Sequence, residues 1–145
     1  MEENLVINNV KSMNHFKLHN IITKDNKAGN IIKFIDIKSK FFDKFGEIYF
    51  SEVNYKMIKG WKLHKQMQMN ICVPAGEVKF VLFCNEKFNE IIMNKKSYIL
   101  TIYPNTWFAF QGMSKNLNLV TNFSNIVHTD EESITKPLSQ FNYEW

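Results

Sequence analysis

The chain has 145 residues, which fits one domain with one core. Hydrophobic residues make up 45% of it, so the chain can bury a sizeable core and is not a disordered tail. The formal charge is +4, but the lysines are spread along the chain. This pattern argues against a nucleic-acid-binding barrel, which usually carries a denser basic stripe, and slightly favours a small anionic ligand.

The N-terminal segment does not have the pattern of a signal peptide, because no apolar core follows a positively charged stretch. No apolar run in the sequence approaches the roughly 18 residues that a membrane-spanning helix needs. Cys72 and Cys84 lie in apolar runs, which favours buried free thiols over a disulfide. We therefore expect a cytoplasmic protein with no membrane partner.

Short β-strands are predicted along the middle of the chain. The strand-like patterns cover residues 47–53, 70–83 (two strands joined by a turn at 75–77), 97–104 (ended by a proline) and 116–126. Turn-like stretches separate them at 85–89, 94–96 and 112–116. No segment has a sustained helical period, although residues 38–44 and a short acidic turn at 129–133 are the best candidates. This pattern predicts an all-β sandwich or barrel with little helix.

In many antiparallel barrels a metal site has a characteristic pattern of four ligands. Two ligands are alternate residues of one strand, a third precedes a glycine turn, and a fourth lies on a later strand. That frame selects Lys62, His64, Met69 (before Gly76) and Phe108 (after Pro104). Only His64 among them binds zinc or iron well. His15 and His19 are best interpreted as surface residues. The sequence therefore predicts no metal and no other cofactor.

Three stretches of the chain together resemble one known family. They are FGEIYFSEVNYKMIKGWKLHKQMQMNICVPAGEVKFVLF, IYPNTWFAFQGMS and the tail NIVHTDEESITKPLSQFNYEW. Their order and spacing resemble the RmlC-like cupins, the dTDP-4-dehydrorhamnose 3,5-epimerase family and its relatives the dTDP-4-oxo-sugar 3,4-ketoisomerases. The resemblance implies that residues 1–145 form a single jelly-roll barrel domain. It also implies a homodimer that exchanges N-terminal strands and acts on a nucleotide-linked 4-keto sugar in surface polysaccharide biosynthesis.

The chain departs from the epimerase pattern at the catalytic positions. In the epimerases a histidine follows an Arg-Gly-aromatic triplet and removes the proton next to the keto group. Here the triplet is residues 59–61 (Lys-Gly-Trp), and the next position is Lys62. A family lysine that stabilises the enolate falls near Met69, and the proton-returning tyrosine falls near Val127 or His128. The epimerase machinery is therefore not intact.

The 3,4-ketoisomerases carry two histidines at alternate positions, and the chain keeps only the second, His64. An imidazole is a suitable base near neutral pH, so His64 is the candidate base. Lys62, on the same strand face, is the candidate for stabilising the enolate and for lowering the pKa of His64. His128 or Tyr103 is the candidate acid.

Four further residues are candidates for substrate contact. Lys59 replaces an arginine and keeps the charge that a diphosphate needs, but it loses the bidentate geometry. Asn54 and Asn70 are possible partners of sugar hydroxyls, and Trp107 is a possible stacking surface, although core packing is the more common role of such an aromatic residue. The predicted function is a metal-independent nucleotide-sugar epimerase or isomerase. The alternative is a non-catalytic cupin that binds a nucleotide sugar after losing the catalytic histidine and tyrosine.

Overall fold

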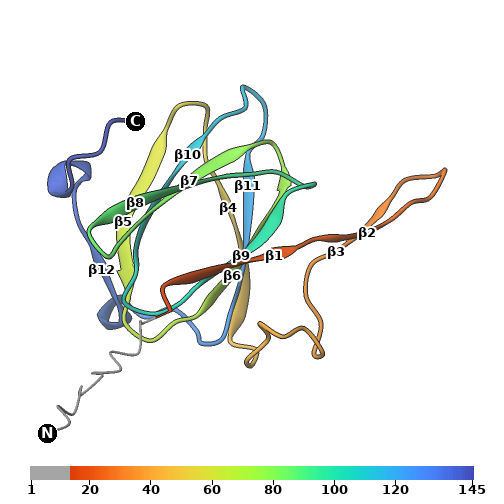
Figure 1. Cartoon of the computed structure of the whole chain (residues 1–145), viewed down its shortest axis with the longest axis horizontal. Helices are drawn as coiled ribbons and strands as arrows, with labels where there is room; N and C mark the ends of the chain where they lie inside the picture. The colour runs from red at the N-terminus through yellow and green to blue at the C-terminus, as the bar shows by residue number, and fades with distance from the viewer. Residues whose placement is uncertain (1–13) are drawn as a thin grey trace, which may run out of the picture.

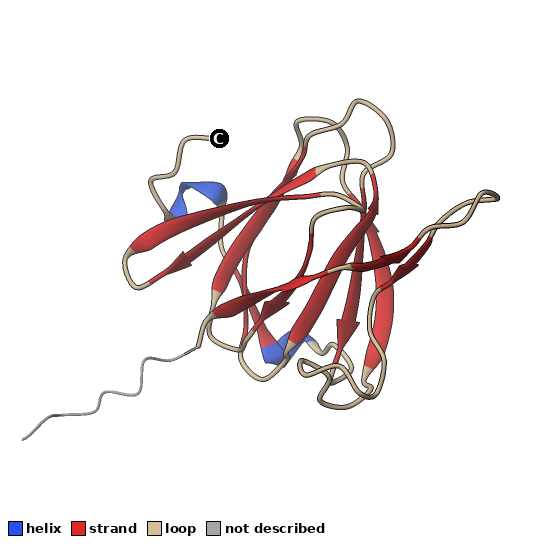
Figure 2. Ribbon diagram, turned by 45° about the vertical axis from the view of Figure 1, so that its right-hand side comes forward, coloured by secondary structure: helices blue, strands red, loops and turns tan. Residues whose placement is uncertain are grey.

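The computed structural model describes residues 14–145, which form two five-stranded antiparallel sheets that face each other as a flattened barrel (Figure 1). The strand order is β1-β9-β6-β11-β4 in the first sheet and β12-β5-β10-β7-β8 in the second. A two-stranded ribbon, β2-β3, extends away from the barrel (Figure 2). In this part of the chain helix is limited to two short 3-10 turns, and no helix is long and apolar enough to cross a membrane.

The strands and turns have the following bounds: β1 Phe16–Asn20, β2 Ile22–Lys24, β3 Ile31–Lys33, β4 Glu47–Glu52, β5 Ile58–His64, β6 Met69–Ala75, β7 Val78–Cys84, β8 Lys87–Met93, β9 Tyr98–Ile102, β10 Trp107–Gly112, β11 Leu119–Ser124, η1 Asp130–Glu132, β12 Ser133–Thr135 and η2 Leu138–Gln140. The all-β prediction is confirmed, and β4, β6, β7, β9 and β11 match predicted strands. The candidate helix at 38–44 is absent.

Strand β8 was missed because the stretch at 85–89 has the composition of a long turn. The turn is only two residues long: Asn85 and Glu86 both have positive φ, at 52° and 59°, which is the geometry of a tight β-hairpin. The chain therefore returns to strand at Lys87 and pairs with β7 from Cys84↔Lys87 to Val78↔Met93.

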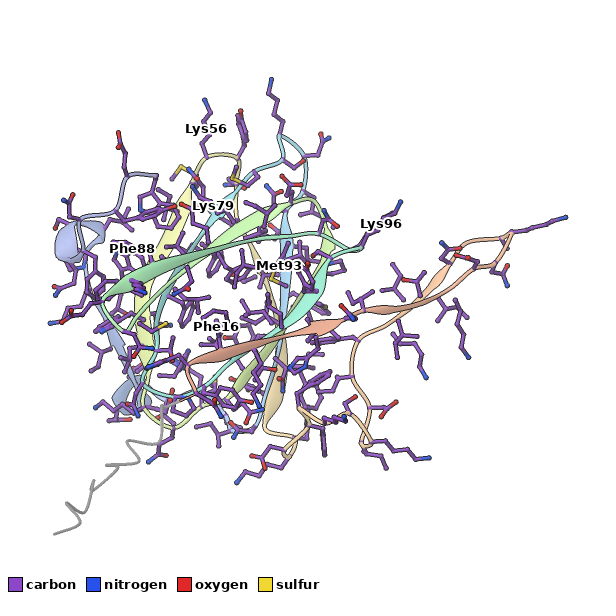
Figure 3. All side chains as sticks on the ribbon, in the orientation of Figure 1. Phe16, Lys56, Lys79, Phe88, Met93 and Lys96 are labelled. Atoms are coloured by element: carbon purple, nitrogen blue, oxygen red, sulfur yellow. The ribbon has the colours of Figure 1, made fainter. Side chains whose placement is uncertain are left out.

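The core lies between the sheets and is built from alternate residues of each strand. On β7, for example, Val78, Phe80 and Leu82 are fully buried in the main core, and Met93 of β8 joins them. Figure 3 shows Met93 within the barrel and Lys96 pointing outward. The alternation leaves a continuous inner face on which a cavity can form.

A second apolar cluster covers the outer face of the second sheet and fixes the register of β5. Trp61 is fully buried there, and the C-terminal residues Phe141, Tyr143 and Trp145 pack over it. The Trp61 indole N–H donates to the Leu138 carbonyl at 3.3 Å. Because successive side chains of a strand alternate, burial of Trp61 outside the barrel turns its neighbour in the chain inward.

Both cysteines are buried and unpaired, as predicted. Burial raises the pKa of the Cys72 thiol to about 11, so this group is an inert part of the structure.

Candidate active site

A cavity of about 430 Å³ opens between the two sheets. Its volume is within the roughly 300–1,000 Å³ of typical small-molecule sites. The first sheet contributes Tyr49 and Asn122 to its wall, and β5 of the second sheet contributes Lys59, Lys62 and His64. The rest of the wall is mainly apolar. A cavity of this kind holds a ligand by shape and orients it through a few polar groups.

The four positions selected by the metal frame all line this one cavity. They are Lys62, His64, Met69 and Phe108. Phe108 stands beside His64, with the two rings nearly parallel and their centroids 5.9 Å apart. The four positions therefore face one cavity, but only one of them carries a histidine.

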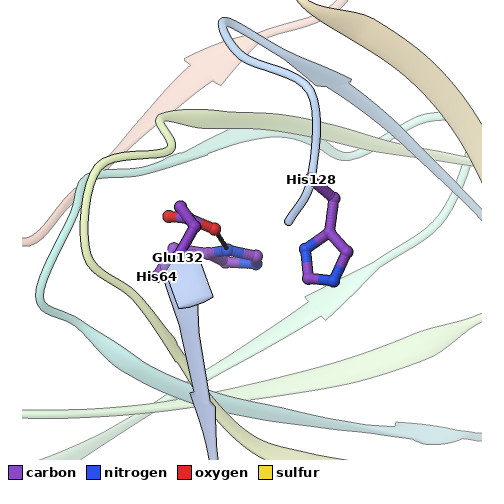
Figure 4. A group of neighbouring side chains, drawn as sticks. All are labelled: His64, His128 and Glu132. Carbon is purple, nitrogen blue, oxygen red and sulfur yellow. Dashed lines mark hydrogen bonds and ion pairs between the residues drawn. The ribbon is translucent and has the colours of Figure 1, made fainter. Parts of the chain in front are cut away.

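His64 forms a buried pair with Glu132 (Figure 4). The distance from His64 Nδ1 to Glu132 Oε2 is 2.6 Å, and the two residues are 3% and 7% exposed. A carboxylate can only accept, so Nδ1 carries the proton in neutral His64, and Nε2 is left with a free lone pair. Nε2 is buried and has no hydrogen-bond partner among the described residues. This is the nitrogen that can accept a proton from a ligand.

Glu132 is held in place by its own contacts. Its Oε1 accepts hydrogen bonds from the backbone N–H of Gln66 at 3.0 Å and of Met67 at 2.9 Å. Strand β12 pairs with β5 so that Ser133 lies opposite His64. This pairing brings Glu132, the residue before Ser133, to the imidazole. The sequence predicts an acidic turn at 129–133 but gives none of its three acidic residues a role.

The pKa values of the two groups leave His64 neutral and Glu132 ionised near pH 7. Burial lowers the pKa of His64, the hydrogen bond and charge of Glu132 oppose this, and the charge of Lys62 lowers it further. Burial alone would raise the pKa of Glu132, but the hydrogen bonds from His64, Gln66 and Met67 outweigh it and leave the pKa below its usual value. His64 is thus neutral at neutral pH, with Nε2 free to accept a proton, as a base requires.

His128 lies beside His64, as the hypothesis of a second proton-transfer residue requires (Figure 4). The ring centroids are 6.0 Å apart and the rings are nearly perpendicular. The backbone N–H of His128 donates to Glu47 Oε1 at 2.9 Å, which anchors the segment before η1. The side chain is half-buried, and it is not part of the wall of the cavity.

His64, His128 and Glu132 also form a group whose ligating atoms lie within 4.8 Å of one another. They do not fit a resident metal well. Glu132 already accepts three hydrogen bonds, and His64 Nδ1 is one of the donors. Only His64 Nε2 and the His128 ring remain, fewer than the three protein ligands of a typical catalytic zinc site.

Treatment with a chelator is therefore expected to leave turnover unchanged. The measurement is the rate of the isomerase or epimerase reaction that the resemblance implies, after dialysis against EDTA, compared with the same sample resupplied with zinc, nickel or iron. Loss of activity on dialysis that one of these ions restores would contradict metal independence.

Tyr49 and Asn122 are site residues that no pattern in the sequence marks. The Asn122 amide donates to the Tyr49 hydroxyl at 2.9 Å, and its buried Oδ1 has no partner among the described residues. Burial raises the pKa of Tyr49, and the nearby carboxylates of Glu47 and Glu132 add to the effect. The hydroxyl is therefore protonated at neutral pH and faces the cavity from the sheet opposite His64.

Both predicted lysines reach the cavity. Lys62 lines it beside His64, two residues away on the same strand face. Lys59 lies at the cavity mouth, where its ammonium donates to Ser51 Oγ at 3.0 Å. The cavity therefore has one cation next to the candidate base and a second at its entrance.

The structure does not bring the remaining candidates to this cavity. Asn70 points to the other face of β6, where Thr101 donates to its Oδ1 at 2.7 Å, because its neighbours Met69 and Ile71 point inward. Trp107 packs outside the barrel against Phe141, with ring centroids 5.7 Å apart.

Tyr103 follows β9 and is also absent from the cavity wall, with its backbone N–H bonded to the His15 carbonyl. Asn54 is exposed and lines a separate groove.

The family model described as "FdtA: WxcM-like, C-terminal" matches residues 13–143. The chain belongs to this family. No curated protein shows significant sequence similarity to the chain. The predicted relationship to the RmlC-like cupins is confirmed.

Several solved structures share the fold. A dTDP-sugar isomerase from Desulfovibrio desulfuricans G20 is 27% identical with a TM-score of 0.81, over 86% of this chain and 85% of that one. QdtA, a sugar 3,4-ketoisomerase from Thermoanaerobacterium thermosaccharolyticum in complex with TDP, is 18% identical with a TM-score of 0.75. The match covers 84% of this chain and 88% of QdtA. ChmJ, a 3'-monoepimerase from Streptomyces bikiniensis, is 6% identical with a TM-score of 0.80. The match covers 92% of this chain and 76% of ChmJ. At the two lower identities the likeness shows the fold alone.

Proposed function

We propose that this family member is a metal-independent isomerase or epimerase of a nucleotide-linked 4-keto sugar. One observation carries the proposal: a buried His64, oriented by Glu132, lies beside a ligand-sized cavity with an Nε2 that has no hydrogen-bond partner among residues 14–145. The dTDP-sugar isomerase at 27% identity supports the substrate class. We place the reaction in surface polysaccharide biosynthesis, as the resemblance implies, and in the cytoplasm, where thiols such as Cys72 and Cys84 stay reduced.

Ketoisomerisation uses the site as follows. His64 Nε2 takes the proton from C3 of the sugar, and its electron pair forms a C3–C4 double bond as the carbonyl at C4 becomes an enolate oxygen. The Lys62 ammonium stabilises that oxygen. The proton of the C3 hydroxyl then passes to the C4 oxygen, which becomes a hydroxyl, while a proton returns to the C4 carbon and the C3–O bond becomes the new carbonyl. Return of a proton to the opposite face of C3 gives epimerisation instead.

Tyr49 is the better candidate acid in this scheme. Its hydroxyl is protonated near pH 7, faces the cavity and stands on the sheet opposite His64. His128 is the alternative, since its ring lies next to that of His64. Tyr103 has no part in the scheme because it does not line the cavity.

Removing the charge of Lys62 is expected to shift the pH dependence of the reaction. In Lys62→Met the pKa of His64 rises, because one of the effects that lower it is lost. The base is then protonated at a higher pH, so the acid limb of the kcat/KM profile moves to higher pH as the plateau falls. An unchanged acid limb would show that Lys62 does not act on His64.

Solvent exchange tests the function directly. The protein is incubated with dTDP-4-keto-6-deoxyglucose, and separately with a GDP counterpart, in deuterated buffer. Deuterium entering at C3 or C5, or movement of the carbonyl to C3, is expected and must disappear in His64→Ala. Binding of a nucleotide sugar without exchange would favour the non-catalytic alternative, and binding of neither would exclude both.

We also propose that the protein is a homodimer. No residue of the β2-β3 ribbon is buried by residues 14–145, and the ribbon exposes Ile22, Ile31 and Ile32. An isolated two-stranded ribbon is marginally stable in water, so packing against a second copy accounts for it. Light scattering is expected to give twice the chain mass. The Ile22→Lys, Ile31→Lys double variant should be monomeric, and a monomeric wild type would contradict the proposal.

A further inference from the structure

We propose that Asn122 recognises the C2 hydroxyl of the sugar, which donates a hydrogen bond to the side-chain oxygen of this residue. This role rests on the proposed function and deepens it, because it names a group that the substrate must carry. Asn122 Oδ1 is a buried acceptor with no hydrogen-bond partner among residues 14–145. The side chain is 2% exposed and lines the sugar cavity.

The nearest side chains of the protein do not satisfy this oxygen. On β11, Asn122 lies opposite Tyr49 of β4 and Ile71 of β6. Its Nδ2 donates to the Tyr49 hydroxyl at 2.9 Å and lies 3.9 Å from the sulfur of Met67, which can only accept. The side chain of Ile71 has no polar group. Because an unpaired buried carbonyl oxygen is costly, we expect its donor to come from the molecule that fills the cavity.

Hydroxyl groups are the donors that a nucleotide-linked 4-keto sugar offers at this place. The ionised diphosphate and the keto oxygen only accept, so either would set one acceptor against another at Asn122 Oδ1. A 4-keto-6-deoxy sugar has two hydroxyls, at C2 and C3. In ketoisomerisation the C3 hydroxyl gives up its proton, whereas the C2 hydroxyl takes no part in the bond changes and can donate throughout. Asn122 Oδ1 is therefore the acceptor for the C2 hydroxyl.

The same amide also holds Tyr49, so a single side chain sets the sugar and the candidate acid relative to each other. Because Asn122 donates to the Tyr49 oxygen, the phenolic proton is not used by Asn122 and remains available to the ligand. Tyr49 faces the cavity from the sheet opposite His64. A sugar that lacks the C2 hydroxyl leaves Oδ1 unpaired and loses this orientation.

The test compares the 4-keto-6-deoxyglucose of the nucleotide that the wild type converts, dTDP or GDP, with its 2-deoxy analogue. In the wild type the ratio of the two kcat/KM values is expected to be roughly 10² in favour of the hydroxylated sugar, because a site built for a hydroxyl rejects a ligand without it. Asn122→Leu keeps the branched shape but has no acceptor, so the ratio should fall to about 1. Tyr49→Phe is expected to lower both rates and keep the ratio, because Oδ1 remains.

Asn89→Leu is the matched control, since Asn89 lies on β8 outside the cavity wall, and it should keep both the rates and the ratio. A wild-type ratio near 1, or a folded Asn122→Leu with the wild-type ratio, would overturn the role of Asn122 and leave the proposed function standing. No conversion of either sugar by the wild type would overturn the proposed function as well. The wild-type ratio needs no variant, so the test does not depend on the folding of Asn122→Leu.

Discussion

Replacing His64 by asparagine is expected to lower kcat/KM by roughly 10³-fold, within the range that general-base catalysis supplies. Asparagine keeps a polar side chain of similar reach opposite Glu132, but it has no nitrogen that can take up a proton near pH 7. The measurement is the initial rate of carbonyl transfer or of epimerisation at C3, together with deuterium exchange at C3. Both should fall together, because both depend on removal of the same proton.

His15→Asn is the matched control for His64→Asn. His15 is half-buried, its Nδ1 lies 3.3 Å from Thr106 Oγ1, and it is outside the cavity wall. This variant should retain wild-type rates. Thermal unfolding of both variants checks that neither has lost the fold. More than one tenth of wild-type activity in a folded His64→Asn protein would mean that another group is the base.

Replacing Glu132 by glutamine is expected to lower kcat by roughly 10²- to 10⁴-fold while the fold is kept. The glutamine Oε1 can still accept from the backbone N–H of Gln66 and Met67, so the amide NH2 faces His64 Nδ1. Nδ1 must then accept, and neutral His64 carries its proton on Nε2. The nitrogen that faces the ligand loses its free lone pair. A wrong tautomer of this kind costs about 10⁴ in serine proteases.

Nitrogen-15 NMR of labelled His64 distinguishes this tautomer effect from a general loss of structure. The wild type is expected to show a protonated Nδ1, and Glu132→Gln a protonated Nε2. The pKa of His64 should fall in the variant, because the hydrogen bond and charge of Glu132 raise it. The acid limb of the profile therefore moves to lower pH, opposite to its movement in Lys62→Met. An unchanged tautomer with full activity would contradict the positioning role.

Glu132→Ala makes a useful comparison because it removes the carbonyl oxygen as well. The backbone N–H groups of Gln66 and Met67 then lose their acceptor, which costs about 1–3 kcal/mol for each group left unpaired in the interior. This variant is expected to unfold at a lower temperature than Glu132→Gln. The difference between the two separates the structural role of the carboxyl group from its effect on His64.

Alternation along β5 was enough to predict that Lys62 and His64 share one face, and the structure sets both at the cavity with Trp61 on the other side. The same alternation explains why two of the predicted contact residues do not reach the cavity. Asn70 is adjacent to the inward-facing Met69 and Ile71, and Trp107 is adjacent to the inward-facing Phe108, so both point away. Residue type suggested a sugar contact at these positions, whereas position along the strand excluded it.

By itself the sequence determined the all-β fold, the shared strand face of Lys62 and His64 and the departures from the family's catalytic residues, because these depend on local alternation and on residue identity. Only the tertiary structure decided which groups surround the imidazole. Glu132 reaches His64 across 68 residues of chain through the pairing of β12 with β5. Tyr49 and Asn122 meet because β4 and β11 are adjacent in one sheet. Strand pairing between distant segments is set by the packing of the whole core, and no local pattern in the sequence encodes it.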